Sequence, residues 1–334
     1  MPKEISHIYF AQQILDILPE EIQETISKHK ELYFYGSVAP DIYYYYLPLN
    51  KSYQKLAKMD IGKKIHDSSN NLQPIHHLLD DLKNYPYELK NKILCFVAGY
   101  LTHVAADIVF HPYIYSITGH YFHNDSKIQN FAQRNHRLFE TCMDLFILKK
   151  IYKQSIKEFS LHQKLTIPKK DSVILDHFGK AIKQSFLDNI FSEYLVVKFT
   201  HYCYKMHISL IKLFQKNFIP KLLFGIQKEL YKHSTFVLFY YDFDFCNHFD
   251  YENFDPAPHP VTNETITGNF YTFTENIKKI GYQFITSIFE AIYERPYLPQ
   301  EWEKLIPHYS LNTGLVGIHI DEMKHFHIHH GFQV

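Results

Sequence analysis

The chain is poor in cysteine, and its few cysteines are scattered along 334 residues. They occupy four positions: Cys95, Cys142, Cys203 and Cys246. No CxxC pair is present, which argues against a zinc ribbon, and the wide spacing argues against a disulfide framework. Cys95 and Cys142 fall within apolar, helical patterns. We therefore expect all four cysteines to be reduced residues of the core.

The chain also lacks net charge, because Lys plus Arg and Asp plus Glu each total 35. A neutral chain has no overall field that attracts nucleic acid or an anionic membrane, although a local patch could still do so. Charged residues make up only 21% of the sequence, whereas hydrophobic residues reach 46%. This balance excludes wholesale disorder and provides for a sizeable core.

Several familiar segments and motifs are missing as well. The N-terminal segment MPKEISHIYFAQQIL contains no apolar signal region, so we expect a cytoplasmic protein. The longest apolar stretch, residues 93–110, contains His103 and Asp107, which make it a poor transmembrane helix and a good buried functional helix. P-loop, dinucleotide-binding and nucleophile-elbow motifs are absent. Histidine, in contrast, is abundant, with 23 residues, and it is the commonest metal ligand.

Apolar spacing and proline positions predict an all-α fold. Apolar residues recur at helical spacing over residues 5–18, and Pro19 begins a further helix. The segment YFYGSVAPD, residues 33–41, predicts a bend because it contains Gly36 and Pro40. Short helical pieces in a loop are expected up to residue 73. Further helices are expected at 74–83, at 89–110 with a stop at Pro112, and at 127–152.

The second half of the chain has weaker sequence signals for secondary structure. Two or three amphipathic helices are expected within 170–234, an irregular segment at 236–264, and a long helix at 265–292. We place a domain boundary near residue 160. It separates a metal-binding domain, residues 1–160, from a mainly helical C-terminal region, residues 161–334, whose role is unknown.

Two sets of histidine and acidic residues, each spaced four residues apart, are the main candidates for a functional site. We call each set a ladder. In GYLTHVAADIVFHP, residues 99–112, His103, Asp107 and His111 are spaced four apart. Four residues turn a helix by about 400°, so these three side chains leave one face within roughly 80° of arc. The next helix repeats the spacing with His136, Glu140 and Asp144. Such faces are typical of metal sites built into helical bundles.

A simpler interpretation is that each ladder is a surface hydrogen bond or a weak ion pair. Two ladders in succession, in an apolar setting, argue against it, because burying two carboxylates without cations costs several kcal/mol each. Upstream, His7, Asp41 and His66 are further candidates. Taken singly, each is more often a helix cap or a solvated side chain. Their order along the chain, ahead of the two ladders, favours a functional role.

The succession SHIYFAQQIL, YGSVAPD, IHD, GYLTHVAADIVFHPYI and NHRLFETCMD resembles the zinc-dependent phospholipase C family, in its intracellular type. That family shares its all-helical fold with the P1-type nucleases. The resemblance covers about residues 5–150. The resemblance implies two or three zinc ions. One would be held by Asp41, His66, His103 and Asp107, a second by His111, His136 and Glu140, and a third by His7 with a bridging Asp107.

The resemblance also implies a mechanism, in which a water held between two metals attacks phosphorus in line. Asp41 would be the catalytic residue that orients or deprotonates this water. Asp144 lies outside the family's ligand set, and we expect it to orient His136. Secreted members complete the third site with an N-terminal Trp, whereas Trp302 is the only Trp here. The α-amine of Pro2, exposed after removal of Met1, is an alternative ligand.

The predicted function is metal-dependent phosphoester hydrolysis, with a phospholipid headgroup as the family-based substrate. A P1-type nuclease or a phosphatase is the alternative within this class, and nucleic acid is the less favoured partner. A non-catalytic metal-binding protein is a second class. An HD-type phosphohydrolase is a third, but the only His-Asp doublet, at His66, lies in a polar loop. The sequence does not indicate the oligomeric state.

Overall fold

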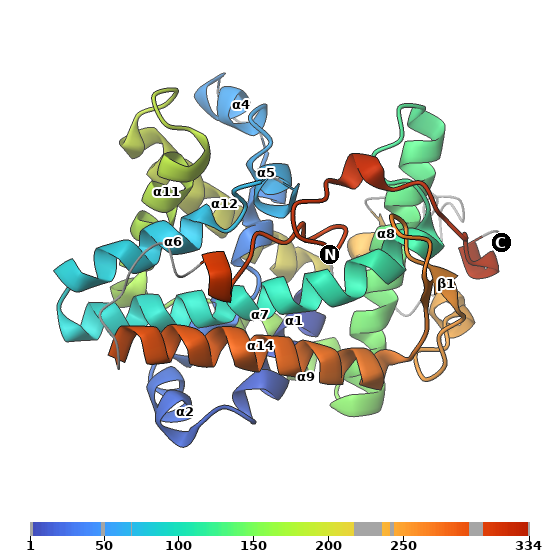
Figure 1. Cartoon of the computed structure of the whole chain (residues 1–334), viewed down its shortest axis with the longest axis horizontal. Helices are drawn as coiled ribbons and strands as arrows, with labels where there is room; N and C mark the ends of the chain where they lie inside the picture. Colours follow the sequence, from blue (N-terminus) through green and yellow to red (C-terminus); the bar gives the residue numbers. More distant parts are fainter. Residues whose placement is uncertain are drawn as a thin grey trace.

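The computed structural model describes residues 3–47, 51–67, 69–216, 236–240, 244–293 and 303–332. Its architecture is all-α, as predicted (Figure 1). The first half contains α1 (Glu4–Leu15), α2 (Glu20–Ser27), α3 (Lys30–Gly36), η1 (Ala39–Tyr44), α4 (Lys51–Ala57), α5 (Ile61–Asp67), α6 (Gln73–Asp80), η2 (Asp81–Asn84), α7 (Tyr87–Thr118), α8 (Ser126–Phe146) and the π-helical turn η3 (Ile147–Ile151).

The second half is mainly helical over residues 156–214 and again over residues 270–293. Its elements are α9 (Ile156–Phe159), α10 (Leu161–Lys164), η4 (Lys169–Asp171), α11 (Val173–Phe186), α12 (Glu193–Phe214), η6 (Phe236–Leu238), η7 (Asp244–His248), β1 (Ala257–Pro258), β2 (Thr265–Ile266), α14 (Phe270–Tyr293), η8 (Ile320–Glu322) and η9 (His330–Phe332). The long helix expected from residue 265 begins at Phe270, because Thr265 and Ile266 pair with Pro258 and Ala257 in a two-stranded antiparallel sheet. Most of the expected helical segment beyond residue 216 lies outside the described residues.

Helix α7 forms the centre of the molecule. It packs against α1, α3, α8 and α14, and Figure 1 shows α14 lying along much of its length. Among the described helices, α7 alone is long and apolar enough to cross a membrane, but 94% of its most apolar window is buried inside the chain. Such burial is what the core helix of a globular fold shows, so length and composition are weak evidence for a membrane span.

The predicted stop at Pro112 is wrong, because α7 continues to Thr118 with the proline inside it. Proline lacks the N–H group that the carbonyl of Ile108 would otherwise accept within the helix. The backbone of Gly314 lies against this carbonyl, since a Cβ added to Gly314 would come 2.4 Å from the Ile108 oxygen. Gly314 also has a φ of +70°, which favours glycine. A C-terminal segment thus covers the position where the helix lacks a hydrogen bond.

The bend predicted at residues 33–41 is displaced, because residues 33–36 form the end of α3. Gly36 is there to let α3 approach α7, rather than to turn the chain. A Cβ on Gly36 would come 2.2 Å from the Phe96 oxygen, and one on Gly99 would come 1.9 Å from the Tyr33 oxygen. The turn follows at Ser37, and it leads into η1. This close contact brings the loop between α3 and η1 against the polar face of α7.

The prediction of four reduced cysteines is wrong in one respect, because Cys142 and Cys246 form a disulfide. Cys95 and Cys203 are free and buried, as expected. The pairing joins α8 to η7 across 104 residues, and it depends on the packing of η7 against α8, which the sequence does not reveal. The cytoplasmic localisation stays a prediction, and a disulfide favours an oxidising compartment over it.

The contact between α3 and α7 gives a first prediction. Gly99→Ala should lower the melting temperature by about 5 °C or more, because the new methyl group meets backbone and overpacking costs about 1–3 kcal/mol. Gly281→Ala is the matched control in α14, since its methyl group meets the flexible end of Ile14. Thermal unfolding followed by circular dichroism compares the two. An equal melting temperature for Gly99→Ala and the wild type would contradict the close-packing account.

Candidate metal centre

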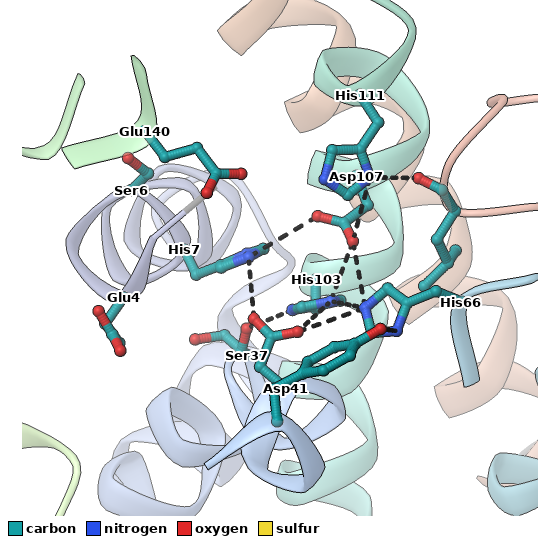
Figure 2. A network of polar contacts seen from close by, with 12 residues as sticks. Glu4, Ser6, His7, Ser37, Asp41, His66, His103, Asp107, His111 and Glu140 are labelled. Carbon is teal, nitrogen blue, oxygen red and sulfur yellow. Dashed lines mark hydrogen bonds and ion pairs between the residues drawn. The ribbon is translucent and has the colours of Figure 1, made fainter. Parts of the chain in front are cut away.

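The predicted ligands come from five helical elements and meet in the interior. They are His7 on α1, Asp41 on η1, His66 on α5, His103, Asp107 and His111 on α7, and His136 and Glu140 on α8. All are buried, although histidine, aspartate and glutamate are usually exposed or only partly buried. Figure 2 shows most of these side chains pointing toward one another around Asp107. The structure therefore brings the whole predicted set together.

Asp107 occupies the middle of this cluster. Its Oδ2 lies 3.1 Å from Nε2 of His103 and 3.6 Å from Nε2 of His66, and its Oδ1 lies 3.7 Å from Nε2 of His7. The carboxylate is fully buried, and neither oxygen has a hydrogen-bond partner among the described residues. A buried carboxylate without hydrogen bonds is strongly destabilising unless a cation compensates it.

Asp41 closes the cluster from the side of η1. Its Oδ1 lies 3.3 Å from Nε2 of His66 and 3.8 Å from Nε2 of His103, and its Oδ2 lies 4.0 Å from Nε2 of His7. The Asp41 side chain is 11% exposed, whereas that of Asp107 is fully buried. Asp41 thus lies at the edge of the cluster that is nearest to solvent.

Backbone carbonyls fix the tautomers of three imidazoles. A carbonyl only accepts hydrogen bonds, so a ring nitrogen that faces one must carry the proton. The Nδ1 atoms donate from His66 to Gly62 (2.7 Å), from His103 to Ser37 (3.0 Å) and from His111 to Leu311. In these rings Nε2 therefore keeps its lone pair, as a metal ligand requires.

The lone pairs of His66 and His103 lie close together, with their Nε2 atoms 3.4 Å apart. Two lone pairs at this distance repel each other, and neither nitrogen has a proton to donate to the other. A cation between these nitrogens and the neighbouring carboxylates removes the repulsion. The nitrogen and oxygen donors are those that zinc takes in proteins, so the residues fit this metal.

A second group adjoins the first through His111. The imidazole of His136 lies 2.9 Å from Glu140, measured from Nε2 to Oε1. Ligand atoms of His111, His136 and Glu140 all lie within 4.8 Å of one another, and Nδ1 of His111 is 3.6 Å from Oδ2 of Asp107. The two groups therefore share one buried polar region, and metals bound to both would be neighbours.

Burial changes the pKa values of these groups in a direction that suits metal binding. It raises the pKa of the Asp107 carboxyl to about 7, although His66 acts in the opposite direction. It lowers the pKa values of the His103 and His111 imidazoles, and that of His136 to about 4. Near neutral pH His103, His111 and His136 are therefore neutral ligands, and the Asp107 carboxylate needs a positive charge beside it.

Asp144 has a different neighbourhood from the one predicted. It accepts hydrogen bonds from the backbone N–H groups of Ile5 (3.0 Å) and Ser6 (2.8 Å) and from the hydroxyl of Tyr240 (3.0 Å). These described bonds hold the first turn of α1 rather than the imidazole of His136. Since His7 lies in the same turn of α1, these hydrogen bonds of Asp144 fix the backbone that carries His7.

Sequence reasoning missed a C-terminal segment that contacts the ligands. We call residues 308–320 the C-terminal strap. In addition to its bond with His111, Leu311 donates its N–H to the carbonyl of His66 (2.8 Å). Ser310 donates its hydroxyl to Asp67 (2.9 Å), the residue that follows His66. The bonded residues are about 200 positions apart, so no local spacing in the sequence could predict the contact.

His7 belongs to the third predicted site, whose predicted terminal ligand lies outside the described residues. His7 stacks on His103 with ring centroids 4.1 Å apart, and it faces Asp107 as predicted. Met1 and Pro2 lie outside the described residues, so a role for the terminal amine stays a prediction.

A comparison with protein families now bears on these residues. The family model for zinc dependent phospholipase C matches residues 6–212. The chain belongs to the zinc-dependent phospholipase C family. This membership confirms the predicted family and all-α fold, and it supports zinc as the metal and a hydrolase as the class of protein. Comparisons with curated proteins and with solved structures found no match.

For this zinc-dependent phospholipase C family member, the matched range contains every predicted ligand and ends before the C-terminal strap. The strap's bonds to His66 and His111 are therefore additions to the part that the family defines. The predicted domain boundary near residue 160 stays a prediction, and the matched range runs past it.

The cluster predicts how zinc content responds to Asp107. Asp107→Asn should lose most of its bound zinc, because an amide supplies no negative charge to the ions around it. Asp176→Asn is the matched control, since Asp176 also pairs with a histidine, at 2.8 Å, but on the surface. Mass spectrometry of protein purified without a histidine tag measures the zinc. Equal zinc content in the two variants would exclude Asp107 from the metal centre.

Proposed function

We propose that this chain is a zinc-dependent phosphodiesterase of the phospholipase C type, which hydrolyses the phosphoester of a phospholipid headgroup. The observation that carries the proposal is the meeting of unprotonated Nε2 atoms with both oxygens of Asp107 and Oδ1 of Asp41, which have no hydrogen-bond partner among the described residues. Such a group is suited to hold metal ions, and the family to which the chain belongs is that of zinc-dependent phospholipase C, in which zinc would serve phosphoester hydrolysis.

The ions would number two or three. Asp41, His66, His103 and Asp107 would hold the first, and His111, His136 and Glu140 the second; His7 would hold a third with Asp107. The chemistry that zinc supplies in such sites is a water of lowered pKa and neutralisation of charge on phosphoryl oxygens.

Asp41 is the proposed catalytic residue. Its Oδ1 has no hydrogen-bond partner among the residues described, and its side chain lies at the solvent edge of the cluster. A carboxylate in this place can accept a hydrogen bond from an entering water and direct the water's lone pair at phosphorus. The fully buried Asp107 lacks this access. Asp41 therefore orients or deprotonates the water, while Asp107 compensates charge.

A cleft beside the cluster favours a lipid over nucleic acid. Its volume is about 380 Å³, and it is lined by Tyr43, Tyr44, Tyr46, Leu56, Ala57, Asp60, Ile61 and Phe199. Tyr44 connects it to the cluster, because its hydroxyl lies 3.4 Å from Nδ1 of His66. No Lys or Arg is among these lining residues, whereas binding of a polyanionic backbone depends on them. The aromatic rings and aliphatic side chains of this cleft can flank an acyl chain.

The experiment compares three substrates on one zinc-loaded preparation: phosphatidylcholine vesicles, single-stranded DNA and bis-p-nitrophenyl phosphate. We expect release of the phosphorylated headgroup from the lipid, loss of this activity with a chelator, and recovery when zinc is returned. Faster hydrolysis of DNA would establish the nuclease alternative. A zinc-loaded protein that hydrolyses none of them would be a non-catalytic metal-binding protein.

Asp41 can be separated from metal binding by one substitution. Asp41→Asn should lower turnover by about 10²–10⁴-fold, because the amide cannot accept the proton of the water. It should leave the ion of His111, His136 and Glu140 in place. Asp176→Asn is the control, since Asp176 pairs with His201 on the surface, outside the cluster and the cleft, and should leave turnover near the wild-type value. Unchanged turnover in Asp41→Asn would remove Asp41 from the catalytic step.

A further inference from the structure

A second group of possible ligands lies away from the central cluster, around His76 on α6. Its imidazole is only 5% exposed, and its Nε2 has no hydrogen-bond partner among the residues that the structure describes. His76 lies close to His308, with ring centroids 5.4 Å apart. A buried ring nitrogen without a partner is costly, and it calls for an explanation.

His308 is held so that its Nε2 can face His76. Leu72 donates its backbone N–H to Nδ1 of His308 (3.3 Å), whereas Oδ1 of Asn71, also 3.3 Å away, is placed to accept a proton from Nδ1, because the Asn71 amide nitrogen bonds the carbonyl of Tyr309. The two contacts belong to opposite tautomers of the ring. A zinc ion on Nε2 would select the one in which Nδ1 donates to Asn71 and Nε2 keeps the lone pair.

Glu303 supplies the carboxylate of the group. Its Oε1 lies 3.9 Å from Nε2 of His308, and one ligand atom from each of His76, Glu303 and His308 lies within 4.8 Å of the others. Ligands of a tetrahedral zinc are about 3.3–3.4 Å apart, as follows from bonds of about 2.0–2.1 Å. The Glu303 side chain is 64% exposed and can move inward to meet this distance.

The other histidine cluster that the described residues form outside the centre has a simpler explanation. It contains Asp255, His329 and His330 in the C-terminal tail. Nδ1 of His329 accepts the N–H of Gly331 (3.0 Å), so its Nε2 carries the proton and donates it to Asp255 (3.2 Å). That histidine is fully engaged by two hydrogen bonds. It offers no lone pair to a metal, in contrast to His76.

We propose that His76, Glu303 and His308 form a second, separate zinc site that fastens the C-terminal strap to α6. Two histidines and one glutamate are a donor set that zinc takes, and water can complete the coordination. His308 begins the strap, and two residues further on Ser310 and Leu311 start to contact Asp67, His66 and His111. A cation at the outer site therefore stabilises the strap that orients the central ligands.

The test counts zinc ions in a protein in which both central ligand groups have been disabled. The double variant Asp107→Asn, Glu140→Gln should keep one zinc per chain after dialysis against micromolar zinc. Adding His308→Asn or His76→Asn to that variant should remove this ion, whereas adding His77→Asn should not. His77 is the neighbouring histidine on α6, and it belongs to none of the possible ligand groups among the described residues. In the otherwise wild-type chain, added zinc should raise the melting temperature less after His308→Asn.

Glu303→Gln keeps the test decisive if a histidine variant fails to fold, because Glu303 is exposed. This change should weaken zinc binding at the outer site at least about tenfold, in line with the loss of a charged ligand. An unchanged affinity, or equal zinc content with and without His76 and His308, would overturn the proposal. Loss of the ion in a His329→Asn, His330→Asn variant would assign it to the tail instead. None of these results depends on which phosphoester is hydrolysed.

Discussion

The structure depends on one costly group, the Asp107 carboxylate, which is fully buried and has no hydrogen-bond partner among the described residues. Water cannot solvate it there, and the same burial lowers the pKa values of the His103 and His111 imidazoles. Without a cation such an arrangement is unfavourable by several kcal/mol. Bound zinc reverses this balance, so the free energy of metal binding becomes part of the free energy of folding.

Much of the remaining fold can be understood as support for that group. The two glycines at the contact of α3 and α7 allow the backbones to approach, and this places Ser37 and Asp41 beside His103. The strap covers α7 at the Ile108 carbonyl, to which Pro112 has no N–H to donate, and it contacts His66 and His111 through Leu311. Helix α7 is thus held from both sides at the level of its ligands.

Local signals in the sequence predicted the all-α fold and the candidate ligands on α7 and α8. Those on α1, η1 and α5 came from the family resemblance, and the long-range contacts were not predictable. The four-residue spacing on α7 and α8 follows from helix geometry, and each ladder therefore needed only the correct helix. The continuation of α7 through Pro112 depends on Gly314, about 200 residues later, and the disulfide of Cys142 depends on how η7 packs. Asp144 continues the four-residue spacing of the second ladder, but its hydrogen bonds include those to the backbone of α1. Helical spacing predicts the direction in which a side chain leaves its helix, but it does not predict which element lies there.

The central claim is that zinc ions lie between Asp107 and the imidazoles around it. X-ray diffraction from crystals of the protein, collected on both sides of the zinc absorption edge, tests it most directly. The account predicts anomalous peaks within about 2.0–2.2 Å of the Nε2 atoms of His66 and His103 and of a carboxylate oxygen of Asp107. A well-ordered crystal of catalytically active protein with no anomalous peak in this cluster would contradict it.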